Sequence, residues 1–225
     1  MDKRAHTSLE YYLHGASPRI LLFSGMHGDE YESGTLLRAY LKKNSAALPD
    51  FLYIPCVSPS AVASKTRRNM YGHDINRQFT ENTTDEEART VMSLLRPFHF
   101  DLCIDVHEDP DRTMGFYLYD SEHMSESELY AYREAVHTTD ARLYTGVDDM
   151  DDEHLNLHVE KGYVSLGYDQ SVETAGFSSR WLYEKNICKR TFTLEVPGKA
   201  PRELKESLIR VVISVLLNVN TSKHS

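Results

Sequence analysis

The chain has 225 residues, of which 40% are hydrophobic and 26% are charged, and its formal net charge at pH 7 is −9. This length predicts a single domain over residues 1–225, and the hydrophobic content suffices for a packed core, which excludes wholesale disorder. The acidic balance argues against a protein that binds nucleic acid or an anionic membrane surface.

The N-terminus, the apolar runs and the cysteines together favour a cytoplasmic protein. The opening sequence MDKRAHTSLEYYLHG lacks the apolar segment of a secretory signal. The most apolar run, LIRVVISVLLNV at 208–219, is too short to span a bilayer and contains Arg210. Cys56, Cys103 and Cys188 are widely spaced and odd in number. We interpret them as reduced core thiols, with no disulfide framework and no cysteine-type zinc site.

Short β-branched or aromatic runs alternate with helical patterns along the chain. The expected strands are 19–25, 51–57, 101–107, 115–120 and 191–196. The expected helices are 30–44, 84–96, 125–138, 178–187 and 201–219. Strands interleaved with helices predict an α/β protein, a three-layer α/β/α sandwich around a mainly parallel or mixed sheet.

Metal-binding and acid–base residue types recur where the expected strands end. His27, His107 and Glu195 each fall at or just beyond the C-terminal end of such a strand. Ligands of open α/β sheets gather at that edge, so we expect these side chains to lie near one another. Asp105, two residues before His107 on the same strand face, is a candidate outer partner of the histidine.

His27, Glu30 and His107 are a candidate ligand set for a metal ion. Two neutral imidazoles and one carboxylate are common ligands of catalytic zinc, with the fourth position left for water. Gly25 and Gly28 allow the turn between strand and helix to fold tightly around an ion. Taken singly, each histidine is more often a hydrogen-bonding residue, and Glu30 would be a carboxylate that favours a helix start.

The segment SPSAVASKTRRNMYGHDINRQF, residues 58–79, predicts a long irregular stretch that carries four candidate site residues. Asn76 and Arg77 suit a substrate carboxylate, which a guanidinium binds bidentately while the amide adds a donor. A second arginine near a metal, Arg67 or Arg68, would polarise a carbonyl and stabilise an oxyanion. The alternative interpretation is a solvated basic loop.

Four motifs in a fixed order resemble the zinc carboxypeptidase superfamily and, within it, the succinylglutamate desuccinylase/aspartoacylase branch. The motifs are GMHGDE at 25–30, the segment 58–79, DVH at 105–107, and TLEVPGK followed by an expected long helix from 193 onwards. Ser58 stands where that branch usually has asparagine. The resemblance covers roughly residues 18–219 and implies a zinc carboxypeptidase-like fold.

The resemblance also implies roles for individual residues. His27, Glu30 and His107 would bind one zinc ion, and Glu195 would be the general base and later the general acid. Asn76 and Arg77 would hold a substrate carboxylate, while Arg67 or Arg68 would polarise the scissile carbonyl. Glu173, in SVETAG, is a rival candidate for the base.

The expected activity is zinc-dependent hydrolysis of an amide or peptide bond next to a free carboxylate, on a small peptide or an acyl amino acid. One alternative is an N-acyl amino acid deacylase of the succinylglutamate desuccinylase/aspartoacylase type. An alternative of another class is a non-catalytic zinc- or ligand-binding module. The acidic segment VDDMDDEHLN, residues 147–156, is interpreted as a surface loop, and its residues 148–152 as a solvated part that rims the cleft and disfavours acidic partners.

Overall fold

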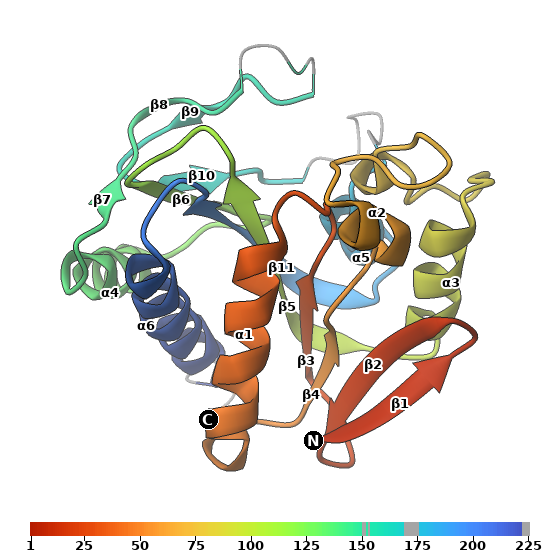
Figure 1. Ribbon diagram of the computed structural model, residues 1–225. Helices are drawn as coiled ribbons and strands as arrows, with labels where there is room; N and C mark the ends of the chain where they lie inside the picture. Colours follow the sequence, from red (N-terminus) through yellow and green to blue (C-terminus); the bar gives the residue numbers. More distant parts are fainter. Residues whose placement is uncertain (150–151, 153, 169–175, 222–225) are drawn as a thin grey trace.

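The computed structural model describes residues 1–149, 152, 154–168 and 176–221, and its central element is a mixed β-sheet (Figure 1). The strands of this sheet are β1 (Asp2–His6), β2 (Leu9–His14), β3 (Ile20–Ser24), β4 (Phe51–Ile54), β5 (Phe100–Asp109), β6 (Gly115–Asp120), β7 (Arg142–Leu143), β10 (Tyr163–Ser165) and β11 (Cys188–Pro197). Within the described residues their order is β1-β2-β4-β3-β5-β11-β6-β10, and β7 also pairs with β6. A small separate sheet joins β8 (Gly146–Val147) to β9 (His158–Val159).

Helices cover both faces of the sheet. The helices are α1 (Tyr31–Asn44), α2 (Pro59–Ser64), α3 (Glu86–Leu95), α4 (Glu126–His137), α5 (Ser178–Glu184) and α6 (Arg202–Thr221). Helices α1, α4 and α6 pack on one face, and α3 and α5 pack on the other (Figure 1). The predicted α/β/α sandwich with a mixed sheet is therefore confirmed.

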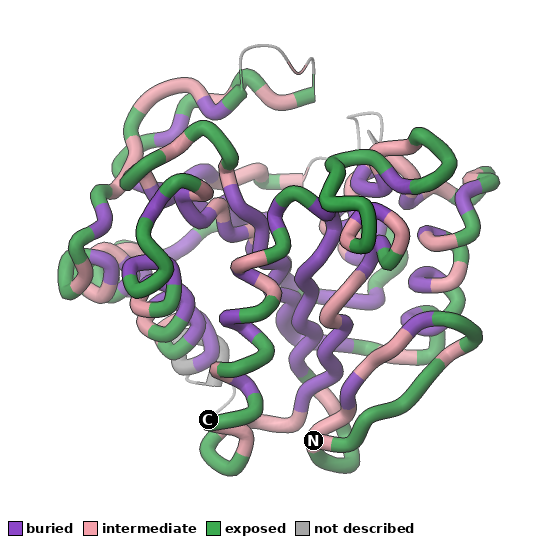
Figure 2. Tube along the Cα trace, in the orientation of Figure 1, coloured by how far each residue is buried: buried purple, intermediate pink, exposed green. Residues whose placement is uncertain are grey.

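The two cores follow from the alternation of side chains along the central strands. Every residue of β3 is buried (Figure 2). Its adjacent residues Leu21 and Leu22 belong to different cores, Leu22 to the core with α1 and α6 and Leu21 to the core with α3. A strand that is apolar on both faces is typical of the centre of a sheet covered by helices. On α6, Leu208, Val212 and Leu216 recur every four residues, so one face of the helix is buried against the sheet.

The register of the central strands brings polar residues side by side. Glu195 of β11 pairs with His107 of parallel β5 and with Tyr117 of antiparallel β6. Two residues earlier along β11, Thr193 pairs with Asp105 of β5 and with Tyr119 of β6. Because paired residues of adjacent strands share a face, these residues form two rows across three strands.

The expected strands and helices are all present, with ends that differ by a few residues. β5 extends to Asp109 and β11 to Pro197, so His107 and Glu195 lie two residues inside their strands. The N-terminal hairpin of β1 and β2 was missed, because β1 exposes nearly all of its residues and has no apolar alternation. Among the described residues, no helix is long and apolar enough to cross a membrane.

Candidate active site

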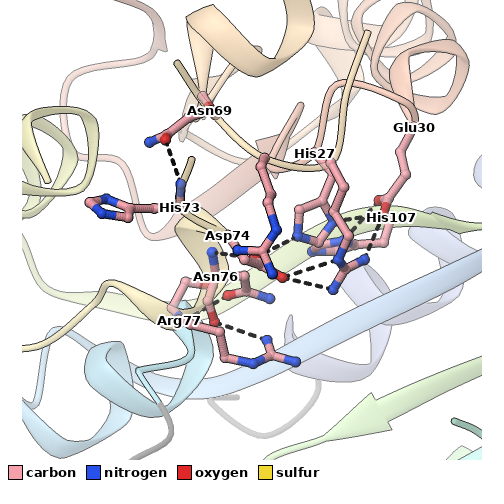
Figure 3. Close-up of polar contacts among 12 residues, drawn as sticks. His27, Glu30, Asn69, His73, Asp74, Asn76, Arg77 and His107 are labelled. Carbon is pink, nitrogen blue, oxygen red and sulfur yellow. Dashed lines mark hydrogen bonds and ion pairs between the residues drawn. The ribbon is translucent and has the colours of Figure 1, made fainter. Parts of the chain in front are cut away.

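His27, Glu30 and His107 converge at the end of the sheet that carries the C-termini of the parallel strands (Figure 3). The Glu30 carboxylate lies between the histidines, with Oε1 2.6 Å from His27 Nδ1 and Oε2 2.9 Å from His107 Nδ1. All three side chains are buried, and one ligand atom from each lies within 4.8 Å of the others. The three side chains are thus placed to share one ion.

The outer ring nitrogens of both histidines face carboxylates. His27 Nε2 lies 3.1 Å from Asp74 Oδ1. His107 Nε2 lies 3.2 Å from Asp105 Oδ2, an ion-pair distance outside hydrogen-bonding geometry. A carboxylate at the outer nitrogen favours the tautomer whose inner Nδ1 carries a lone pair, which is the arrangement of metal-ligating histidines. The pairing of Asp105 with His107 agrees with its proposed place as an outer partner.

The electrostatics of the trio suit a divalent cation. Burial alone would raise the pKa of Glu30, but the two neighbouring imidazoles hold that pKa below its ordinary value. The pKa of His107 is raised well above its ordinary value by Asp105 and Glu30, although burial opposes this. Two inward Nδ1 atoms facing a buried carboxylate favour positive charge between them, which a proton or a metal ion can supply.

The turn that carries His27 depends on two glycines. Gly25 has φ +64°, a conformation that side chains other than glycine rarely adopt. At Gly28 a Cβ atom would lie 1.8 Å from the carbonyl oxygen of Ala61, because the turn packs directly on α2. Gly28 N also donates to Thr66 O at 2.9 Å. The turn is therefore fixed against the segment that carries the arginines.

Glu195 faces the same cavity from β11, beside His107. Burial raises the pKa of Glu195 to about 8. A carboxyl group with a pKa close to the working pH is suited to accept and return a proton. The rival base candidate, Glu173, lies outside the described residues.

The raised pKa predicts that Glu195 costs stability in the metal-free protein. The folded-state pKa exceeds the unfolded value of 4.5, so the cost is absent below pH 4.5 and grows as the pH rises towards 8. With EDTA present, Glu195→Gln should raise Tm at pH 8 by at least about 2–4 °C, the effect of 1 kcal/mol in a chain of this size. Differential scanning fluorimetry from pH 4.5 to 8 measures the difference in Tm between Glu195→Gln and the wild-type protein. A difference that did not increase with pH would contradict the assigned pKa.

The two adjacent arginines of the 58–79 segment have different surroundings. Arg67 lines the cavity, its Nε donates to Asp74 Oδ2 at 3.1 Å, and its Nη1 lies 3.8 Å from Glu30 Oε1. Arg68 is exposed and donates instead to Gly72 O at 3.0 Å. Of the two, Arg67 faces the His–Glu–His cluster.

Asp74 joins the turn that carries His27 to the following Asn-Arg pair. Its Oδ1 accepts hydrogen bonds from Asn76 N and faces His27, while its Oδ2 binds Arg67. Asn76 Oδ1 accepts from Ser178 N at 3.0 Å, and the Arg77 guanidinium lies 4.1 Å above the Phe177 ring. Residues 74–77 of the 58–79 segment are therefore built into the site, whereas residues 63–68 and 70–72 are exposed to solvent.

One cavity of about 830 Å³ unites these groups. Its lining includes His27, Glu30, Arg67, Arg77, His107 and Glu195. It also includes Tyr117 and Tyr119 of β6, which the sequence reasoning did not single out. The alternation in GFYLYD could have indicated them, because it places both tyrosines on one face of the strand. On that face, Tyr117 pairs with Glu195 of the neighbouring strand.

The acidic segment is less solvated than the sequence suggested. Asp148 is buried, and its Oδ2 accepts from Tyr119 at 2.6 Å while its Oδ1 accepts from Leu157 N at 2.7 Å. The interpretation of this segment as a solvated loop was wrong for Asp148, because a tyrosine of the sheet below supplies a buried partner. Residues 150, 151 and 153 of the segment lie outside the described part of the chain.

The sheet order, the helices on both faces and the buried His–Glu–His cluster define an α/β protein of the zinc carboxypeptidase-like fold class. The family model of the succinylglutamate desuccinylase/aspartoacylase catalytic domain matches residues 16–221, so the chain belongs to this hydrolase family. This match confirms the resemblance found in the sequence. A search of the curated proteins finds no match.

Solved structures share the fold at low sequence identity. A candidate metallopeptidase from Shewanella amazonensis SB2B is 22% identical with a TM-score of 0.74, covering 93% of this chain and 81% of its own. Murein-tripeptide amidase MpaA from Escherichia coli O157 is 20% identical with a TM-score of 0.60, covering 92% and 86%. A succinylglutamate desuccinylase/aspartoacylase from Rhodobacter sphaeroides is 18% identical with a TM-score of 0.57, covering 94% of this chain but 57% of its own.

Proposed function

We propose that the protein is a zinc-dependent hydrolase that cleaves an amide or peptide bond next to a free carboxylate. The observation that carries this proposal is the convergence of three kinds of group on one cavity. These are a metal-binding trio, a carboxyl group with a raised pKa and two arginines. Each group answers one need of amide hydrolysis: activation of water, transfer of protons, and binding of negative charge.

His27, Glu30 and His107 would hold one zinc ion. When bound, zinc lowers the pKa of water towards about 7 and polarises a carbonyl group. Glu195 takes the proton of the attacking water and returns it to the leaving amine. Arg67 stabilises the oxyanion that develops on the carbonyl, and Asn76 and Arg77 bind the substrate carboxylate.

A mixed-pool digest tests the substrate class. Zinc-loaded protein would be incubated with short peptides, muropeptide fragments and N-acyl amino acids, with Glu195→Gln as the blank, and the products identified by mass spectrometry. We expect release of a residue that carries a free carboxylate from a peptide. The structural similarity to a murein-tripeptide amidase makes peptides with γ-linked diaminopimelate the first candidates.

A second candidate function is deacylation of N-acyl amino acids, which the match to the succinylglutamate desuccinylase/aspartoacylase model favours. Both reactions use the same metal trio, base and carboxylate site, so the digest separates them by product. Release of succinate, acetate or another acyl group alone would establish the deacylase. If no substrate were turned over, the non-catalytic binding module would be the better description.

Arg67 and Arg68 provide a matched pair of variants. Arg67→Met should lower kcat by about 10²- to 10³-fold, because it removes a donor to the developing oxyanion. Arg68→Met removes the same charge one residue away, outside the cavity lining, and should change kcat less than about twofold. Steady-state kinetics on the best substrate of the pool measures both. Equal losses in the two variants would contradict the assignment of Arg67.

A further inference from the structure

The acidic segment continues from the hairpin of β8 and β9 (Figure 1). Its residues Asp148, Asp149 and His154 line the cavity. Its base is firmly held, since Asp148 accepts hydrogen bonds from Tyr119 and from Leu157 N. Farther along, Asn156 N donates to Asp149 O at 2.9 Å, which pairs the two arms of the segment beyond the hairpin. The segment is thus directed at the site by contacts with the sheet.

Asp152 lies in this segment between Asp149 and His154, which both line the cavity. Its Oδ1 accepts from His154 N at 2.9 Å, and its carbonyl oxygen accepts from Leu155 N at 3.1 Å, so the residue begins a tight turn. The His154 ring lies edge-on to the Phe177 ring, with centroids 6.4 Å apart. Phe177 is the ring on which Arg77 stacks, so the turn is packed against the proposed carboxylate site.

The remaining oxygen of Asp152 is bound to Arg77. Asp152 Oδ2 accepts a charge-assisted hydrogen bond from Arg77 Nη2, and the two side chains are only 21% and 18% exposed. The other terminal nitrogen, Arg77 Nη1, donates to Asn76 O at 3.1 Å. Both terminal nitrogens of Arg77 therefore have acceptors within the chain, and one of them is a carboxylate.

We propose that Asp152 is an internal competitor for the substrate carboxylate and sets the affinity of the Arg77 site. This inference rests on the proposed function, in which Arg77 binds that carboxylate. An incoming carboxylate that pairs bidentately needs the edge of the guanidinium that Asp152 holds. Two carboxylates on one guanidinium also repel each other, so substrate must displace Asp152 from Arg77.

The test is a binding experiment that needs no turnover. 3-Phenylpropanoate, a monocarboxylate without a scissile bond, is titrated calorimetrically into zinc-loaded wild-type protein and Asp152→Asn. Asparagine keeps the Oδ1 acceptor for His154 N but loses the negative charge on Arg77. We expect Kd to fall about three- to fivefold, the scale of one partly exposed ion pair. The neutral analogue 3-phenylpropanamide should bind both proteins equally.

Two controls separate competition from a general change in charge. Asp111→Asn also removes a carboxylate near the cavity, but Asp111 is 91% exposed and pairs with Lys199, so Kd should not change. In an Arg77→Met background, Asp152→Asn should have no effect on Kd, because the guanidinium for which Asp152 and the ligand compete is absent.

Weaker or unchanged binding of 3-phenylpropanoate to Asp152→Asn would overturn the proposal. Weaker binding would mean that Asp152 orients Arg77 for the ligand. A failure of the proposed function gives a different result, namely no product from the mixed pool. The calorimetric comparison of Kd values would still measure whether Asp152 competes with the ligand for Arg77. If turnover is found, Asp152→Asn should lower KM by the same factor as Kd and leave kcat unchanged.

Discussion

Replacing Glu195 with glutamine is expected to lower kcat by about 10²- to 10⁴-fold, the range for loss of a general acid–base group. Glutamine has nearly the same shape but cannot accept the proton of water or return it to the leaving amine. The metal trio is formed by other residues, so zinc content should stay at one ion per chain. Turnover of the best substrate and zinc by atomic emission, measured on the same preparation, check both expectations.

A shorter carboxylate supplies the matched control. Glu195→Asp keeps the titratable group but draws it back towards the main chain of β11, so it should retain more activity than Glu195→Gln. Full activity in the glutamine variant would remove Glu195 from the mechanism. That result would make Glu173, which lies outside the described residues, the next candidate for the general base.

Loss of the metal is expected to abolish turnover, and His107→Ala should reproduce that loss permanently. Without the imidazole, two protein ligands hold the ion, and affinity for zinc should fall by more than about 100-fold, beyond the usual effect of losing an outer partner. Activity of the wild-type protein should disappear on chelation and return on addition of zinc. A fluorescent zinc chelator used in competition measures the affinity independently of turnover.

His73 offers the control for this experiment. It lies in the segment that carries the arginines, but it is apart from the His–Glu–His cluster (Figure 3). Its Nδ1 is 2.9 Å from Asp85 Oδ2, and it does not line the cavity. His73→Ala should therefore leave zinc affinity unchanged. Equal losses of zinc in His73→Ala and His107→Ala would show that the metal is held elsewhere.

The parts of the site that the sequence predicted are those in which local geometry and strand register decide the outcome. His27 and Glu30 are three residues apart in a glycine-bounded turn, and no distant contact is needed to bring them together. His107 and Glu195 stand near the ends of strongly apolar strands, whose buried faces fix their register. These four residues could be placed at one edge of the sheet before their distances were known.

Other features depend on contacts between distant parts of the chain. The choice between Arg67 and Arg68 is set by the turn after α2, where Lys65 adopts φ +54° and Gly28 N binds Thr66 O. No periodic pattern in the sequence encodes that turn. The contact of Asp152 with Arg77 joins residues 75 positions apart, so composition indicated only that the loop was acidic.

The row His107–Glu195–Tyr117 also constrains how the protein reaches its native state. Its members come from three strands, and β5 and β11 are paired in parallel although about ninety residues separate them in the chain. Closing so long a loop is slow compared with forming a local turn, so we expect this pairing to form late in folding. The turn with His27 and Glu30 can form early and meet an ion, but it cannot act on a substrate. Under the proposed mechanism, a nascent chain would therefore gain hydrolytic activity only after β11 has paired with β5 and placed Glu195 beside His107.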